Sequence, residues 1–140
     1  MVLTYYTENG IMLADRGIVL VYSVDFYQDE SGKEPVFEYM LTLFRKNDKD
    51  SRIKLQKIQD YIRTLKEHGT YAGEPYIKHL DGPIWELRPL RDRITFAPWI
   101  DGGFLLLHRF MKSTRKTPQR EIEYAKRLLA NFYERRETYE

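Results

Sequence analysis

The chain has 140 residues, 42% of them hydrophobic and 31% charged, and a formal net charge of +2. This composition is typical of one globular domain with a real core and excludes a disordered or fibrous chain. The absence of cysteine excludes disulfides, thiolate catalysis and Cys-based zinc sites. No stretch approaches the ~20 apolar residues of a membrane span, and the N-terminus lacks the pattern of a signal peptide, so a cytoplasmic location is expected.

Residues 1–16 show no sustained period and are predicted to form an N-terminal extension to a single domain over residues 17–140. The β-branched and aromatic stretch GIVLVYSVDFY, which begins at Gly17, predicts a strand. Pro35 suits the first turn of a helix, and apolar residues follow it at helical spacing up to Phe44. The first half of the domain therefore starts with a strand and a helix.

A second amphipathic helix is predicted after the polar break KNDKD, with Asp50 or Ser51 as its N-terminal cap and Gly69 as its stop. The segment AGEPYIKHLDGP, at 72–83, is punctuated by glycine and proline and is predicted to be a loop. The hydrophobic period then changes from 3.6 to 2. Three short strands are therefore predicted in IWELRPL, RITFAPW and FLLLHRF.

The last amphipathic helix is predicted to begin with Thr117 as its N-cap and Pro118 at its first helical position. The predicted order is therefore β-α-α-β-β-β-α. Because runs of strands and runs of helices are segregated, this order indicates an α+β fold, in which a small antiparallel sheet packs against helices on one face.

The net charge conceals one strongly basic segment. Residues 88–120 carry eight Lys or Arg and two acidic residues, a segment charge of +6, whereas the rest of the chain carries 15 basic and 19 acidic residues, or −4. Such a concentration of cations is typical of an anion-binding face. Arginine grips phosphate at two points, lysine adds a point charge, and a helix start adds free N–H groups. The segment therefore favours binding of a phosphodiester backbone.

Other catalytic patterns are absent from the sequence. The three histidines are not spaced as a helical metal-binding pair, and no H-E-x-x-H or D-x-D-x-D-G motif occurs, so no metal or other cofactor is expected. The motifs G-x-G-x-x-G, G-x-x-x-x-G-K-[ST] and G-x-S-x-G are also missing, which argues against nucleotide hydrolysis and serine-hydrolase chemistry.

The basic residues also have structural interpretations. Arg88 follows Glu86 by two positions on the same strand face, so the two could form a structural ion pair. His108 ends an apolar run and could be a satisfied core histidine. The cations that follow His108 could belong to a solvated connector, and Lys78 with His79 could simply be exposed loop residues.

The stretch YIKHLDGPIWELRPLRDRITF, followed by LLLHRFMKSTRKTPQREIEYAKRLL, resembles the RelE/HigB toxin superfamily, in particular its phage-derived HigB-like branch. That branch has a K-x-L…ELR strand before an L-L-H-x-F-x-K-K-T-Q-K-T-P-x-x-E-I-x-x-A segment. The resemblance spans residues 17–136 and implies a compact RelE-like α+β toxin that cleaves translated mRNA in the ribosomal A site, without a metal. It also implies a HigA-like helix-turn-helix antitoxin that neutralises the toxin, with operator DNA bound only through the antitoxin complex.

The resemblance also implies catalytic roles for five residues. Arg88 corresponds to the arginine of ELR, and Arg93 to a strand arginine used on the scissile phosphate. His108, Lys112 and Lys116 correspond to the histidine and lysines of the last motif. The charge of the segment and its flanks predicts four further RNA contacts: Lys78, Arg91, Arg109 and Arg115.

Four residues depart from the pattern of that branch. Arg109 replaces the usual Gly after the histidine, Ser113 and Arg115 stand where Lys and Gln are usual, and Phe96 takes the place of a common Tyr. The alternative function is therefore a non-catalytic module of the same fold that binds RNA or a protein partner through the same face.

Overall fold

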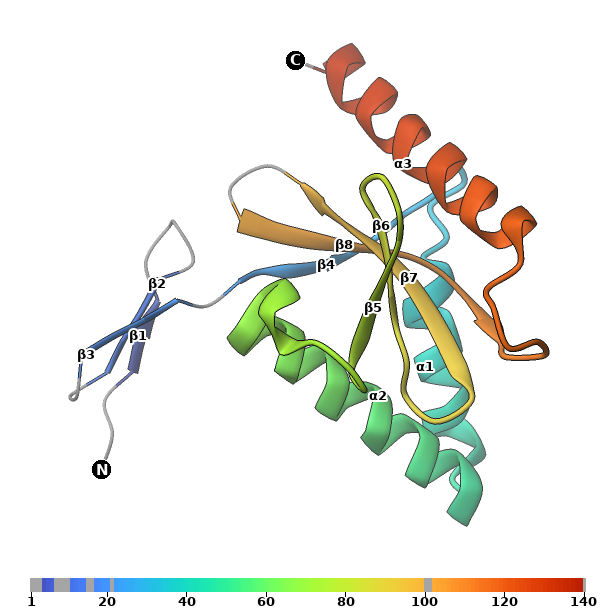
Figure 1. Cartoon of the computed structure of the whole chain (residues 1–140), viewed down its shortest axis with the longest axis horizontal. Coiled ribbons are helices and arrows are strands. Elements are labelled where there is room, and N and C mark those ends of the chain that lie inside the picture. The colour runs from blue at the N-terminus through green and yellow to red at the C-terminus, as the bar shows by residue number, and fades with distance from the viewer. Residues whose placement is uncertain (1–3, 7–10, 15–16, 21, 100–101, 140) are drawn as a thin grey trace.

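The computed structural model describes residues 4–6, 11–14, 17–20, 22–99 and 102–139. Its strands form two sheets (Figure 1). The strands of the smaller, antiparallel sheet are β1 (Thr4–Tyr6), β2 (Ile11–Ala14) and β3 (Gly17–Leu20). The strands of the larger sheet are β4 (Val24–Phe26), β5 (Ile77–Asp81), β6 (Ile84–Leu87), β7 (Asp92–Trp99) and β8 (Gly103–Met111). The helices are α1 (Pro35–Lys46), α2 (Lys49–His68), the short 3-10 helix η1 (Gly69–Ala72) and α3 (Gln119–Tyr139).

The single strand predicted from Gly17 is two strands in the structure. β3 pairs with β2 in the small sheet, whereas β4 pairs with β8 in the large one. The predicted boundary between the extension and the domain falls beside residues 15–16, which lie outside the described residues, and it stays a prediction.

The large sheet has the order β4-β8-β7-β6-β5 and is mixed, because β4 runs parallel to β8 while the other pairs are antiparallel. The α+β class is confirmed, but the prediction of an antiparallel sheet is wrong. The predicted loop at 72–83 contains β5, so four strands follow the helices instead of three. β5 lies at the edge of the sheet and exposes Lys78 and His79, so it needs no apolar run and carries no strong strand signal.

Helices cover both faces of the large sheet, which corrects the prediction that they lie on one (Figure 1). On one face, Ile58 and Leu65 of α2 pack with Phe96 and Leu106. On the other, Ala125 and Leu129 of α3 belong to a second cluster with strand residues. The nearly continuous apolar run of β8 follows from this arrangement, because a strand covered on both faces has no solvent-facing side.

The predicted helix boundaries are correct to within a few residues. α1 begins at Pro35 as predicted, and Gly69 ends α2 with φ +59°, where an added Cβ would lie 2.7 Å from the ring of Tyr22. The N-cap of α2 is Asp48 rather than Asp50 or Ser51, and its side chain accepts a hydrogen bond from Ser51 N at 2.9 Å.

A β-bulge in β8 sets the direction of the side chains near its end. Thr95 pairs with His108 but Phe96 pairs with Leu106, so Leu107 is the extra residue. Leu107 belongs to the cluster under α3, and His108 reaches Glu121 of α3. The bulge therefore directs two consecutive side chains toward the same face.

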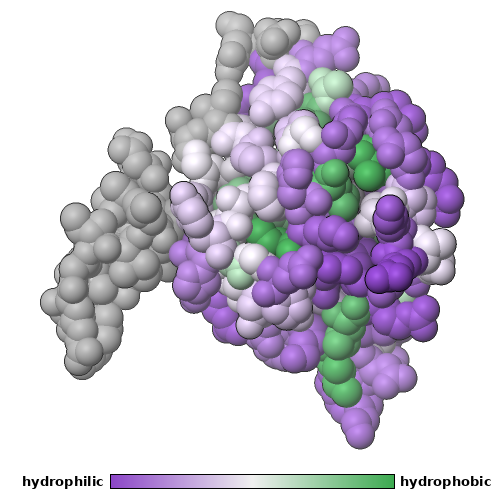
Figure 2. Space-filling model, in the orientation of Figure 1, coloured by the Kyte–Doolittle hydropathy of each residue, from purple (hydrophilic) through white to green (hydrophobic). Residues whose placement is uncertain are grey.

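The surface is mostly polar on the face drawn in Figure 2, where apolar side chains form small separate patches. Among the described residues, no helix is long and apolar enough to cross a membrane.

Candidate functional site

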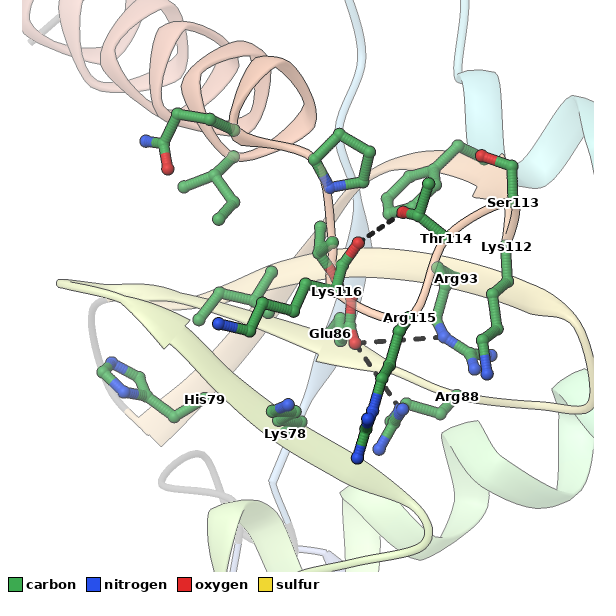
Figure 3. A pocket seen from close by; sticks show the side chains of 16 residues that line it. Lys78, His79, Glu86, Arg88, Arg93, Lys112, Ser113, Thr114, Arg115 and Lys116 are labelled. Carbon is green, nitrogen blue, oxygen red and sulfur yellow. Dashed lines mark hydrogen bonds and ion pairs between the residues drawn. The ribbon is translucent and has the colours of Figure 1, made fainter.

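A pocket of about 270 Å³ opens on the α3 side of the large sheet, between β6, β7, the loop after β8 and the start of α3. Six of the nine cationic or imidazole side chains predicted to act on RNA line it: Lys78, Arg88, Arg93, Lys112, Arg115 and Lys116. Figure 3 shows the charged ends of Arg88, Arg93, Lys112 and Arg115 pointing into the same region. We call this site the cationic pocket.

The strand register explains why these residues meet. Lys78 on β5 lies opposite Glu86 on β6, and Glu86 lies opposite Thr95 on β7. Side chains two apart on a strand share a face, so Arg88 joins Glu86 and Arg93 joins Thr95. One row of polar positions thus crosses three strands on the α3 face.

Arg93 is the most buried cation of the pocket, with only 7% of its side chain exposed. Its Nη1 donates to the carbonyl oxygens of Leu90 and Asp92, both at 2.9 Å. Leu90 has φ +57°, a conformation that turns usually assign to Gly or Asn. Burial lowers the pKa of Arg93 and the nearby charge of Arg88 lowers it further, while Glu86 opposes both effects. The backbone thus holds this guanidinium in one orientation.

Arg88 forms the ion pair with Glu86 that the sequence suggested as a structural alternative. Arg88 Nε lies 3.5 Å from Glu86 Oε2, and Arg88 Nη1 lies 3.9 Å from Glu74 Oε1. The Nε atom is buried and makes no hydrogen bond, so its contact with Glu86 is electrostatic only. The side chain is 22% exposed, which leaves part of the guanidinium accessible from the pocket.

Glu86 and Thr117 are site residues that the sequence prediction missed. Glu86 is 1% exposed and lines the pocket, and the Thr117 hydroxyl donates to Glu86 Oε1 at 2.6 Å. The prediction of Thr117 as a helix cap is wrong, because α3 begins at Gln119 and the Pro118 carbonyl accepts from Glu121 N at 3.0 Å. The alternation of Glu86 and Arg88 along the strand was the available signal for Glu86.

The loop after β8 carries the exposed cations of the pocket. Arg115 and Lys116 are exposed and Lys112 is half-buried. In the part of the chain that the structure describes, none of these three side chains forms an ion pair. The backbone of Lys112 is fixed instead, because its N–H donates to the Arg91 carbonyl at 2.8 Å. The pocket therefore combines buried, oriented arginines with lysines that form no ion pair in the described residues and one arginine in solvent.

His108 does not line the pocket. Its Nδ1 lies 2.6 Å from the Thr95 hydroxyl and its Nε2 lies 2.8 Å from Glu121 Oε2. Burial lowers its pKa below the ordinary value of 6.5, although Glu121 opposes the shift. The neutral ring then donates from Nε2 to Glu121 and accepts at Nδ1 from Thr95. This environment matches the core histidine considered as an alternative, and a catalytic role stays a prediction.

The free energy of unfolding should decrease as the pH falls below about 6.5. Since the folded-state pKa of His108 is the lower one, the unfolded chain takes up its proton first, and stability is lost toward the folded-state pKa. Urea denaturation at a series of pH values should show a shallower decrease for His108→Gln. The comparison variant His68→Gln removes an imidazole that is 61% exposed and is measured at the same pH values. Equal slopes for wild type and His108→Gln would contradict the assignment.

Arg91 and Arg109 lie outside the pocket. Arg91 Nη2 donates to the Lys112 carbonyl at 3.3 Å. Arg109 belongs to the opposite face, where its guanidinium lies 3.8 Å from the ring centre of Tyr39 and donates to Asp92 Oδ1 at 3.1 Å. The Tyr39 hydroxyl also donates to Asp92, at 2.9 Å, and burial together with this hydrogen bond raises the pKa of Tyr39 to about 12. These three residues form a polar cluster between α1, β7 and β8.

No group of three or more His, Cys, Asp or Glu side chains within the described ranges is arranged to hold a metal ion. The guanidinium and ammonium groups that line the cationic pocket can bind and orient a polyanion.

The fold and pocket define an α+β protein with a cationic site, and comparison with known families identifies its class. Residues 42–130 match the model of the family described as phage-derived protein Gp49-like (DUF891). Since the match covers more than half of the 140 residues and all nine predicted site residues, the chain belongs to the Gp49-like family. That family is part of the RelE/HigB-like toxin–antitoxin superfamily. A comparison with curated proteins found no match.

Proposed function

We propose that this protein is the toxin of a type II toxin–antitoxin pair and cleaves mRNA on the ribosome, as a HigB-like member of its superfamily. The observation that supports this proposal most is the cationic pocket. Arginines from the strand region and lysines from the loop after β8 converge there, within a family related to toxin–antitoxin systems. A near-neutral protein in which six cationic side chains line one pocket is suited to binding a phosphodiester backbone.

The cleavage needs no protein nucleophile. The ribose 2′-oxygen attacks the adjacent phosphorus, the bond to the leaving 5′-oxygen breaks, and the proton of the 2′-OH leaves while the 5′-oxygen gains one. Arg93 and Arg88 would stabilise the charge that gathers on the phosphate oxygens, and Lys112 and Lys116 would hold the phosphate and the neighbouring backbone. For His108 to exchange a proton with RNA, it would have to release one of its two hydrogen bonds.

The proposed partners are an mRNA in the ribosomal A site and a HigA-like helix-turn-helix antitoxin. Neutralisation requires only that the antitoxin cover or fill the cationic pocket, because the charged groups proposed to act on RNA converge there. Operator DNA would be bound through the antitoxin in the complex.

The test is induction of the protein in cells, followed by mapping of the 5′ ends of messages. Wild type should arrest growth and create new 5′ ends within translated regions, and Arg93→Ala combined with Lys112→Ala should abolish both effects. The matched control, Arg63→Ala combined with Lys57→Ala, removes the same charges from α2 and should behave as wild type. Growth arrest without new 5′ ends, or RNA binding that weakens with salt but leads to no cleavage, would favour the non-catalytic module instead.

A further inference from the structure

A carboxylate lies in the wall of a pocket whose other charged lining residues are lysines and arginines. Glu86 is 1% exposed. Its Oε1 accepts from the Thr117 hydroxyl at 2.6 Å, while its Oε2 lies 3.5 Å from Arg88 Nε and 3.9 Å from Arg93 Nε (Figure 3). A buried carboxylate is costly unless its oxygens have partners, and here each oxygen has its own.

The two oxygens of Glu86 connect parts of the chain that are distant in sequence. One contacts the arginines at the end of β6 and the start of β7. The other holds Thr117, which is 31 residues further along and ends the loop that carries Lys112 and Lys116. The negative charge also separates two guanidiniums that repel each other. Glu86 is therefore placed to fix the arginines and the lysine loop in one mutual geometry.

We propose that Glu86 is a positioning residue of the cationic pocket, a role that rests on the proposed RNA cleavage. It holds Arg88 by charge and the lysine loop through Thr117, and its charge adds to the backbone hydrogen bonds that orient Arg93, without touching the RNA. The same negative charge lies beneath the place where phosphates bind, so it opposes RNA binding while it favours the reactive geometry. Removal of the charge should consequently lower turnover without weakening RNA binding.

The decisive variant is Glu86→Gln, which keeps the shape and an oxygen that can accept from Thr117 but removes the charge. We expect RNA to bind about as tightly as in wild type or several-fold more tightly, measured by fluorescence anisotropy with an oligoribonucleotide at low salt. The cleavage rate on programmed ribosomes at saturating protein should fall by at least about 10-fold. A cleavage rate within twofold of wild type, or binding that weakens in parallel with cleavage, would overturn the proposal.

A second pair of variants tests the hydrogen bond from Thr117 to Glu86 separately from the charge of Glu86. Thr117→Val removes the hydroxyl but leaves the carboxylate, so cleavage should fall without any gain in RNA affinity. Thr117→Ser keeps a hydroxyl and should restore cleavage toward the wild-type rate. Equal cleavage by the Val and Ser variants would remove Thr117 from the proposal and contradict the connection between strand and loop.

Arginine side-chain NMR tests the positioning even if the wild type cleaves no RNA. In the wild-type protein, the Nε–H groups of Arg88 and Arg93 should give distinct signals with slow solvent exchange. In Glu86→Gln, both should exchange faster and shift toward the position of the exposed Arg115, whose own signal should not change. Unchanged Arg88 and Arg93 signals would refute the role of Glu86, whereas absence of cleavage in wild type alone would refute only the proposed function.

Discussion

Replacement of Arg93 by alanine is expected to lower the rate of mRNA cleavage by about 100-fold or more. Its guanidinium is held by the carbonyl oxygens of Leu90 and Asp92 before any ligand binds, so it can stabilise transition-state charge without reorganising. Lysine should not substitute, because one ammonium group cannot contact both carbonyls and also present a second nitrogen in the pocket. The rate should be measured with programmed ribosomes at saturating protein.

Arg91→Ala is the matched control for Arg93→Ala. Arg91 is exposed, lies outside the pocket and contacts only the Lys112 carbonyl among the contacts described for its side chain. Its removal should weaken RNA binding a few-fold at most and leave the cleavage step intact. Thermal unfolding of both variants checks that the folded state survives. Cleavage by Arg93→Ala within threefold of wild type would contradict a direct role for this guanidinium.

The contrast between Arg91 and Arg93 shows how much of the site the sequence can predict. The cation-rich segment identifies the region, and the alternation of IWELRPL correctly places Glu86 and Arg88 on one face. Charge alone could not separate Arg93, which is buried and oriented, from Arg91, which is exposed, because the two arginines are only two positions apart, one in the turn before β7 and one at the start of β7. Their difference arises from the start of β7 and its pairing with β8.

Other errors also have a physical origin in tertiary contacts. β5 reads as a loop because an edge strand can be polar and still satisfy its backbone through one neighbour. The direction of His108 depends on the bulge at Leu107, which strict alternation along FLLLHRF cannot encode. Thr117 has the residue type of a helix cap, but a buried carboxylate 31 residues earlier takes its hydroxyl. In each case a contact with another element overrides a local preference.

Asp92→Ala is expected to lower the free energy of unfolding by about 3 kcal/mol. Asp92 is 2% exposed and accepts hydrogen bonds from the Tyr39 hydroxyl and from Arg109. Removal of the carboxylate leaves a guanidinium that is 29% exposed without its counter-charge, and a phenol without its acceptor. Urea denaturation measures the change. The control Asp25→Ala, at an exposed position on β4, should stay within about 0.5 kcal/mol of wild type.

A double-mutant cycle with Arg109→Ala tests whether this loss comes from the cluster. The cost of Asp92→Ala should shrink by about 1 kcal/mol or more when Arg109 is already alanine, because the unpaired guanidinium is then absent. In Asp92→Ala, the pKa of Tyr39 should also fall from about 12 toward its ordinary value of 10, because the hydrogen bond and the charge of Asp92 are lost. Burial should keep it above that value. Additive effects, or an unchanged tyrosine titration, would contradict the cluster.

The single variant Arg109→Ala also tests the RNA contact that the charge pattern predicted for Arg109. Arg109 contacts Tyr39 and Asp92 on the face covered by α1, whereas the cationic pocket lies on the face covered by α3. Arg109→Ala should therefore destabilise the fold but leave RNA affinity unchanged at temperatures where the variant is folded. Asp92 and Arg93 are neighbours in sequence with opposite roles, since successive side chains of a strand face opposite sides of the sheet. Loss of Asp92 should consequently appear as lost stability and loss of Arg93 as lost cleavage.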